Sequence, residues 1–588
     1  MSSADVSGES SPRPSALGPY EDGPHESHPL LGNDANQEYP PRHLAVYQPP
    51  SLRFRAFLVR VLALLCACFF SVGSHYGSYI LAPLKSRLSR EMGTSNTEFS
   101  LLVSAFSLNS TWTPLIGGLM ASRLGTTFTS ILATGAIFSG LSLLLIGDLM
   151  QSVRLMACGM FIFGLGVSPL AVVQETIIVR FFRSHGLGLS LALGLVAGKA
   201  ASFISARTSY PLSERYGPHA PFYAAATLGA ISFLINLVYV YASAWLVDGA
   251  GAELEAPELQ EAARRFAIQD MSEAEALEKV AKKKKVNLRE LTKLGDVFWA
   301  YIAVNVLCGA IWHPFTHLAA NIIERRYQLP ESEASTQASY LLAGSIFLYP
   351  IVGFIIDRVK RPSFVIVLFA CSSLLTLFAY TWLVLPPSAT HTAWPAIVSF
   401  ATGIGYSPLL LVVIVPQLVQ SKYISTTLGA HKSLEQTGTT ISQTLAGIAL
   451  DAKVKNIMDI SSKNHAAEDA RYQSLLFSFL VVNVLQFIGI ILLAYLDRRD
   501  KAANRHWLAN TNPEPAPSQT LEHPDLQGPE IAAESEEDLA LEPERRRRGK
   551  FFAVSCVVLI VFAWVLFLVT AWMKLRSKRE REGGRAPT

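Results

Sequence analysis

Gly164-Leu165-Gly166-Val167-Ser168-Pro169-Leu170 recurs in the second half of the chain as Gly403-Ile404-Gly405-Tyr406-Ser407-Pro408-Leu409, and both copies lie inside long apolar stretches. A second pair of segments repeats at almost the same spacing, because Gly118 to Arg123 matches Gly353 to Arg358. Two repeats at nearly one spacing indicate a chain built by duplication. The repeats therefore predict two parallel halves of about six helices each.

The composition indicates a membrane protein. Half of the 588 residues are hydrophobic and 16% are charged, whereas soluble domains carry about 25% charged residues. The apolar residues gather in runs long enough to cross about 30 Å of hydrocarbon. All six cysteines lie in such runs, which fits neither a disulfide framework nor a zinc site. We find no set of residues typical of an enzyme or a nucleic-acid module, and we expect no metal or cofactor.

We expect an all-α polytopic fold with two six-helix halves and one further C-terminal helix. The expected spans are 58–81, 101–121, 127–147, 155–181, 187–209, 221–245, 298–320, 338–356, 363–385, 393–418, 425–450 and 473–496. The expected domains are a disordered cytosolic tail (1–52), the first half (53–247), a cytosolic loop (248–296), the second half (297–499), a polar disordered segment (500–550), the extra helix (551–574) and a basic tail (575–588).

The loops predict the orientation of the spans. Basic residues, such as the run from Lys282 to Lys285, gather in the loops that are cytosolic if the N-terminus is cytosolic. The opposite loops carry mixed charges. The segment 551–574 has basic clusters on both sides, and as a thirteenth span it would place the C-terminus across the membrane. A re-entrant or interfacial placement of this segment is the alternative.

The second pair of repeated segments predicts a latch at the cytosolic ends of two helices. Its glycines let a neighbouring helix approach, its acid can cap a helix N-terminus, and its arginines can pair with carboxylates. The first copy has Ser122 in place of the acid, so we expect a weaker latch in that half. The expected latch residues are Gly118, Arg123, Gly353, Asp357, Arg358 and Arg361.

Ionisable residues inside spans are costly, so we treat them as candidate substrate ligands. Lys199 lies near the middle of its span and needs an anionic partner. Glu435 lies in the corresponding span of the second half, so these two residues could hold the carboxylate and the amine of a zwitterion. The alternative is an ion pair between the halves that never touches substrate. The expected substrate-binding residues are Lys199, Glu435, Ser168, His75, Tyr79, His313 and Gln436.

The N-terminal tail carries Glu26 four residues before the pair Leu30-Leu31. Clathrin adaptors bind that spacing in extended cytosolic tails through side-chain pockets. The motif predicts sorting to a vacuolar or lysosomal membrane, although so short a string also occurs by chance.

Over about residues 55–500 the chain resembles the major facilitator superfamily, and within it a branch of lysosomal dipeptide transporters. The resemblance rests on Phe163 to Gln174 and on Leu428 to Asp451. It implies twelve core helices, an endolysosomal membrane and facilitated export of dipeptides to the cytosol. Animal members of the branch use a glycosylated accessory membrane protein, and the resemblance leaves open whether this chain has such a partner.

The chain also departs from the branch at the residues that would bind substrate. Ser168, Tyr79 and Met160 stand where the branch has two acids and an arginine, and Lys199 replaces another arginine, which removes a bidentate donor for a carboxylate. Glu435 is an acid where the branch has an amide. We therefore hypothesise that amine recognition has moved to Glu435, and that the loss of two acids favours uniport over proton coupling.

The leading interpretation is a transporter that moves a small organic solute across a bilayer by alternating access. The best candidate solute is a dipeptide or an amino acid that leaves the vacuole or lysosome. One alternative is transport of another organic anion such as a monocarboxylate, for which Lys199 suffices and Glu435 is structural. A second alternative is a nutrient receptor that keeps the fold without transport.

Overall fold

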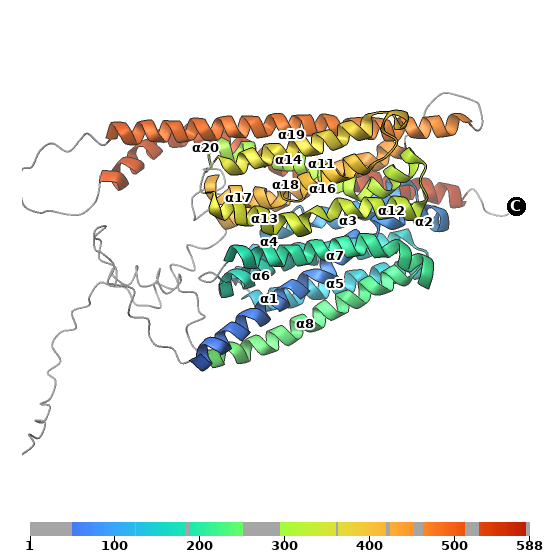
Figure 1. Cartoon of the computed structure of the whole chain (residues 1–588), viewed down its shortest axis with the longest axis horizontal. Helices are drawn as coiled ribbons and strands as arrows, with labels where there is room; N and C mark the ends of the chain where they lie inside the picture. Colours follow the sequence, from blue (N-terminus) through green and yellow to red (C-terminus); the bar gives the residue numbers. More distant parts are fainter. Residues whose placement is uncertain are drawn as a thin grey trace, which may run out of the picture. The chain divides into compact units, whose positions relative to one another are not determined.

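Thirteen hydrophobic spans are expected from the sequence, and the computed structural model contains helices at all of these positions (Figure 1). It describes residues 50–123, 125–182, 187–250, 294–359, 363–418, 424–451, 462–511 and 529–583. Every regular element in this part of the chain is helical, and ten of its helical segments are long and apolar enough to cross a membrane. The structure thus confirms the all-α polytopic fold.

Among the described residues, the first half contains nine elements, and its second span is divided between α3 and α4. The division falls at Ser110 to Trp112, where the Thr111 and Thr113 hydroxyls donate to the carbonyls of Leu108 (2.7 Å) and Asn109 (2.9 Å). The elements are α1 (Pro50–Tyr79), η1 (Ala82–Leu84), α2 (Lys85–Met92), α3 (Asn96–Asn109), α4 (Thr113–Arg123), α5 (Gly125–Leu149), α6 (Val153–Phe182), α7 (Leu187–Tyr216) and α8 (Ala220–Ala250).

The second half repeats this order with two further breaks. The elements are α11 (Asp296–Tyr327), α12 (Glu331–Ser339), η4 (Tyr340–Leu342), α13 (Gly344–Arg358), α14 (Phe364–Val384), α15 (Pro387–Thr390), α16 (Trp394–Ile404), α17 (Ser407–Leu418), α18 (Ile424–Asp451) and α19 (Ser462–Thr511). We call the end of the bundle that holds α2 and α12 the α2 end (Figure 1).

The repeated glycine segment interrupts the helix in one half only. In the second half α16 ends at Ile404 and α17 begins at Ser407, so that Pro408 stands in a first helical turn, where its missing N–H costs nothing. In the first half α6 continues through the segment with Pro169 inside it. The glycines are packing positions: a Cβ added at Gly164 would lie 2.4 Å from the carbonyl oxygen of Phe106 in α3.

The two halves meet along α3 and α18, and α7 packs against α12 and α13. Hydroxyl groups line the first contact: Thr440 donates to Ser107 (2.9 Å), and Thr444 donates to Ser104 (3.2 Å). We call these four residues the hydroxyl seam.

The extra helix, α20 (Pro529–Gly583), lies beside this seam. Just before its apolar run Arg548 pairs with Asp296 (3.4 Å), and just after it Lys574 pairs with Asp451 (2.9 Å). The apolar run therefore lies along the bundle from the start of α11 to the end of α18, and its placement as a thirteenth span stays a prediction. Its inward stripe repeats every three or four residues, as in a coiled coil, through Ala553, Cys556, Ile560, Ala563, Phe567 and Thr570.

The segment expected to lack structure, 500–550, is partly helical. α19 continues to Thr511 and α20 begins at Pro529, so each helix is longer than its apolar span. The residues involved are rich in alanine, glutamate, leucine and arginine, which favour helix without any apolar run.

Candidate functional site

Glu435 lies where α11 and α18 are in backbone contact. A Cβ added at Gly309 of α11 would lie only 1.9 Å from the carbonyl oxygen of Glu435 in α18. This approach brings His313, one turn after Gly309, to the Glu435 carboxylate, with 3.2 Å between Nε2 and Oε1. The Lys432 ammonium donates to the other carboxylate oxygen at 2.8 Å. The acid is therefore neutralised within its own half, by residues of α11 and α18.

His431 of α18 is a third basic group near the Glu435 carboxylate. His431 Nε2 lies 3.8 Å from Glu435 Oε2, which is too long for a hydrogen bond. Its other ring nitrogen lies 2.8 Å from the Tyr301 hydroxyl, which donates to the Leu411 carbonyl at 2.8 Å. Since that hydroxyl uses its proton on Leu411, His431 is the donor to Tyr301, and this fixes the ring orientation.

The first half contributes Lys199 from α7 and His75 from α1. The charges of Lys432 and Glu435 act electrostatically on the Lys199 ammonium. The charges of both lysines act in the same way on His75. His75 lies against Gly198, the neighbour of Lys199, and the Ser202 hydroxyl is 3.4 Å from its Nδ1. We call Lys199, Lys432, Glu435, His75 and His313 the central charge cluster. Within the described part of the chain, the Lys199 ammonium has no hydrogen bond or ion pair to a protein acceptor.

The two paired side chains differ in exposure, because the Lys432 side chain is 49% exposed while Glu435 is 5% exposed. With two lysines and one carboxylate, the central charge cluster carries a net positive charge at neutral pH. Such a site can hold an anionic group, and Lys199 is the cation that lacks a protein partner among the described residues.

Three of the expected substrate residues make no hydrogen bond or ion pair with the Glu435 side chain in the described part of the chain, although the Glu435 charge acts on Tyr79. Tyr79 stacks on His317 of the other half, with 5.0 Å between ring centroids, and packs in a small apolar cluster with Ala206. Ser168 is buried in α6, where the next residue, a proline, packs on α4. Gln436 follows Glu435 on the helix and is buried, so it points to a different side of α18.

The expected latch is only partly described by the structure. Arg361 falls outside the described residues, as do the sorting residues Glu26, Leu30 and Leu31, and the side chains of Arg123 and Asp357 are not described either. Gly118 lies in α4 and Gly353 in α13. The Arg358 guanidinium stacks over the Phe354 ring of its own helix, 5.0 Å from the ring centroid. The latch stays a prediction.

The structure reveals contacts between the halves at the α2 end that the sequence did not predict. Lys85 donates to Asn321 (2.6 Å), Ser86 donates to Glu324 (2.5 Å), and Arg90 pairs with Glu331 (2.6 Å). These bonds join α2 of the first half to α11 and α12 of the second. The α2 end is therefore closed in this structure.

Asp451 adds a further tie between the halves at this end. Its carboxylate oxygens accept from the backbone N–H groups of Asn96 (3.1 Å) and Thr97 (2.9 Å) at the start of α3. Lys574 of α20 donates to the same carboxylate at 2.9 Å and to Ser95 at 3.4 Å. A negative charge at a helix N-terminus is favourable because it faces free N–H groups and the positive end of the helix dipole.

Known proteins with similar sequences are transporters. The human lysosomal dipeptide transporter MFSD1 is 23% identical over 410 residues, which cover 67% of this chain and 80% of that protein. The mouse protein of the same name is 24% identical over 463 residues, covering 75% of this chain and 90% of that protein.

Solved transporter structures share the fold at low sequence identity. The peptide transporter POT in complex with sulfate has a TM-score of 0.53 at 13% identity, over 74% of this chain and 95% of that one. A mutant form of the nucleoside transporter NupG has a TM-score of 0.51 at 12% identity, over 74% of this chain and 99% of that one. At these identities the likeness establishes the fold alone.

The family model described as Major Facilitator Superfamily matches residues 65–443, which is more than half of the chain. Together with the two-half helical architecture, this makes the chain a membrane transporter rather than an enzyme. The chain belongs to the Major Facilitator Superfamily.

Proposed function

We propose that the chain moves a small carboxylate-bearing solute, best represented by a dipeptide or an amino acid, by uniport out of a vacuole or lysosome. In this proposal the N-terminus is cytosolic, so the α2 end faces the lumen. The observation that supports the proposal is the central charge cluster, in which Lys199 has no protein acceptor among the described residues and is acted on by the charges of a second lysine and Glu435. The similarity to lysosomal dipeptide transporters supports the choice of solute.

Lys199 is the residue we assign to the solute carboxylate. A half-buried lysine that lacks an ion-pair partner is costly because its ammonium loses hydration, and a bound carboxylate offsets that cost. Lys432 is already paired with Glu435 at 2.8 Å, so it is the weaker candidate for this role.

In this proposal Glu435 binds the solute ammonium, which first has to replace the Lys432 ammonium on the carboxylate. The carboxylate is held by Lys432 and His313 in the structure, so an incoming ammonium has to replace Lys432. The displaced Lys432, which is half exposed, can then turn to the solute carboxylate beside Lys199. The exchange keeps the number of charge pairs constant while the solute is bound.

Transport of a monocarboxylate is the second candidate, and the same ion pair favours it. If Lys432 stays on Glu435, the cluster offers one unpaired cation and no free acid, which suits a solute with a carboxylate and no amine. In that case Lys199 alone recognises the solute.

Flux in proteoliposomes tests both candidates. Purified protein is reconstituted, and uptake is measured for a dipeptide, an amino acid and a monocarboxylate, with the variants Lys199→Gln and Glu435→Gln. We expect Lys199→Gln to abolish uptake of every transported solute. Glu435→Gln should remove uptake of amine-bearing solutes under the first candidate and leave monocarboxylate uptake intact under the second.

A matched control guards against loss of folding. Asp497→Asn removes a carboxylate that pairs with Lys501 in the same helix, and we expect it to keep uptake near the wild-type level. Normal dipeptide uptake in Lys199→Gln would refute the assignment of that residue. Absence of flux for all solutes in the wild-type protein, despite binding, would favour a receptor.

The location in a vacuolar or lysosomal membrane is a separate part of the proposal, and the tail motif provides its test. Replacing Leu30 and Leu31 by alanine should move a fluorescently tagged protein to the cell surface if a clathrin adaptor reads the pair. Unchanged localisation would show that another signal sorts the protein. An accessory membrane protein that copurifies with the chain would extend the likeness to the animal transporters.

A further inference from the structure

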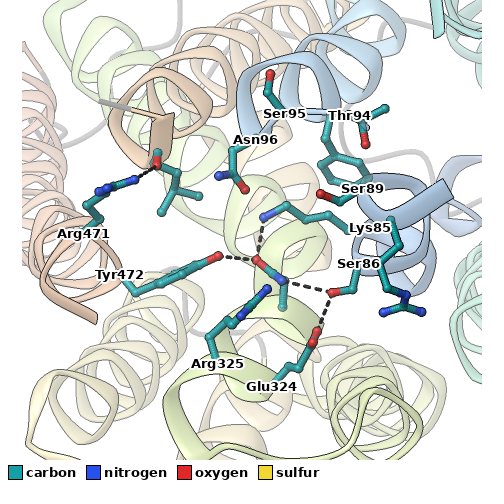
Figure 2. Close-up of a pocket in the computed structure, with 14 residues that line it drawn as sticks. Lys85, Ser86, Ser89, Thr94, Ser95, Asn96, Glu324, Arg325, Arg471 and Tyr472 are labelled. Carbon is teal, nitrogen blue, oxygen red and sulfur yellow. Dashed lines mark hydrogen bonds between the residues drawn. The ribbon is translucent and has the colours of Figure 1, made fainter. Parts of the chain in front are cut away.

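A second polar site lies at the α2 end, away from the central charge cluster. It is a pocket of about 260 Å³ between α2 and α3 of the first half and α11, α18 and α19 of the second. Figure 2 shows Lys85 entering it from one side and Arg325 and Tyr472 from the other. Because its walls come from both halves, the pocket exists only while the α2 end is closed.

The lining of this pocket is strongly basic. It includes Lys85, Arg90, Arg325 and Arg471, and the only carboxylate among its described lining residues is Glu324. Arg90 is paired with a neighbouring acid, Glu331, and Glu324 accepts from Ser86. The excess of positive charge suits an anion.

Lys85 is the lining residue that most requires an anionic partner. It is only 5% exposed, and its ammonium donates to a neutral acceptor, the Asn321 side-chain oxygen, at 2.6 Å. The same oxygen also accepts from the Tyr472 hydroxyl at 2.5 Å. No carboxylate of the described residues lies within ion-pair distance of the ammonium. Asp451 and Glu324 act on it only at longer range, and Arg325 opposes them.

A buried ammonium of this kind is expensive without a counter-charge. Two of its three N–H donors have no acceptor among the described residues, since its only hydrogen bond goes to Asn321. A second donor in the lining is also unsatisfied, because Arg471 Nε is buried and has no partner among the described residues, while Nη1 donates to the Leu450 carbonyl at 3.0 Å. Unsatisfied buried donors in a basic pocket indicate a missing acceptor.

We propose that this pocket binds a small oxyanion, with Lys85 as its anchor, and that the bound anion holds the two halves together at the α2 end. Two sources share this chemistry: an inorganic anion such as phosphate, and the carboxylate of a small solute. A ligand that contacts both walls binds the closed state better than the open state and shifts the population toward closure. The site does not depend on the identity of the solute bound at the central charge cluster.

Thermal unfolding of the purified full-length protein tests the proposal. The probes are inorganic phosphate, acetate and glycylglycine, each compared with sodium chloride at the same ionic strength. We expect at least one of the first two probes to raise the Tm by a few degrees in a saturable manner. Stabilisation by phosphate alone identifies the inorganic source, and stabilisation by acetate and glycylglycine identifies the carboxylate.

Two variants separate this site from the central one. Lys85→Gln should abolish the anion-dependent rise in Tm, while Lys199→Gln, which removes a lysine from the central charge cluster, should keep it. Asn321→Asp places a carboxylate on Lys85 within the protein, so it should raise the basal Tm and remove the response to added anion. This last variant keeps the test valid if Lys85→Gln fails to fold.

Hydrogen exchange gives a second readout, because anion binding should slow exchange of the amides at the start of α3. The proposal is overturned if no probe stabilises the wild-type protein beyond the chloride control, or if Asn321→Asp responds to anion as the wild type does. Loss of the response in Lys199→Gln would place the anion at the central charge cluster instead. The failure of solute flux would not affect any of these outcomes.

Discussion

Asp451→Asn should open the α2 end. The substitution keeps the shape of the side chain but removes the charge that faces the Asn96 and Thr97 amides, and it turns an NH₂ group toward one of these two donors. A hydrogen bond to a charged group contributes about 1.5–3 kcal/mol, whereas the ion pair with the partly exposed Lys574 adds less than about 1 kcal/mol. We therefore expect a loss of about 2 kcal/mol, or a shift of ~30-fold toward the open α2 end.

The same carboxylate should hold the α2 end closed in an acidic lumen. Asp451 follows the expected span 425–450, and although burial raises its pKa, the hydrogen bonds from Thr97 and the contact with Lys574 hold the pKa well below its ordinary value. A carboxylate with a lowered pKa stabilises the folded arrangement above its ordinary pKa of about 3.9 and loses that effect only as the pH falls toward the lowered value. Closure should therefore be unchanged between about pH 7 and pH 5.

Hydrogen exchange of the segment 94–99 measures this closure directly. Exchange of the Asn96 and Thr97 amides should be up to ~30-fold faster in Asp451→Asn than in the wild type. The matched control is Asp497→Asn, which removes a carboxylate that pairs with Lys501 in the same helix, at 2.7 Å, and that has no ion pair with the first half among the described residues. Wild-type exchange in Asp451→Asn, or equal acceleration in both variants, would refute the reasoning.

Two packing predictions follow from the helix contacts. Gly309→Ala should lower the Tm sharply, because the added Cβ would lie 1.9 Å from the Glu435 carbonyl oxygen. In the control variant Gly135→Ala the nearest atom to the added Cβ is 3.6 Å away, so the Tm should stay unchanged or rise slightly. Ala563→Leu should push α20 away from α3 and α18 and lower the free energy of unfolding by about 1–3 kcal/mol, because Ala563 is fully buried. The control variant Val558→Leu, on the exposed face of α20, should change this free energy little. Thermal unfolding checks both pairs, and equal effects within a pair would contradict the packing described.

Part of the candidate site could be predicted from the sequence. The placement of Lys199 and Glu435 in corresponding helices led us to expect them near each other. In the structure the Glu435 charge acts on Lys199, while the role of both residues in binding solute stays a prediction. The pairing of Glu435 with Lys432 could also have been noticed, because residues three apart share a helix face. The contact of His313 with Glu435 could not have been predicted, because it depends on the close approach of α11 and α18 at Gly309.

The sequence by itself determined the two helical halves, the positions of the spans and the presence of a thirteenth helix, because these depend on local properties: the length of apolar runs and an internal repeat. Only the tertiary structure decided how the halves are joined. Asp451 binds backbone amides about 350 residues away, and backbone amides carry no sequence signal. Lys85 and Asn321 look like ordinary polar residues at helix ends, and only their burial in one pocket makes the missing charge visible. Contacts between distant polar groups arise from packing, so they can be known only once the helices are placed in space.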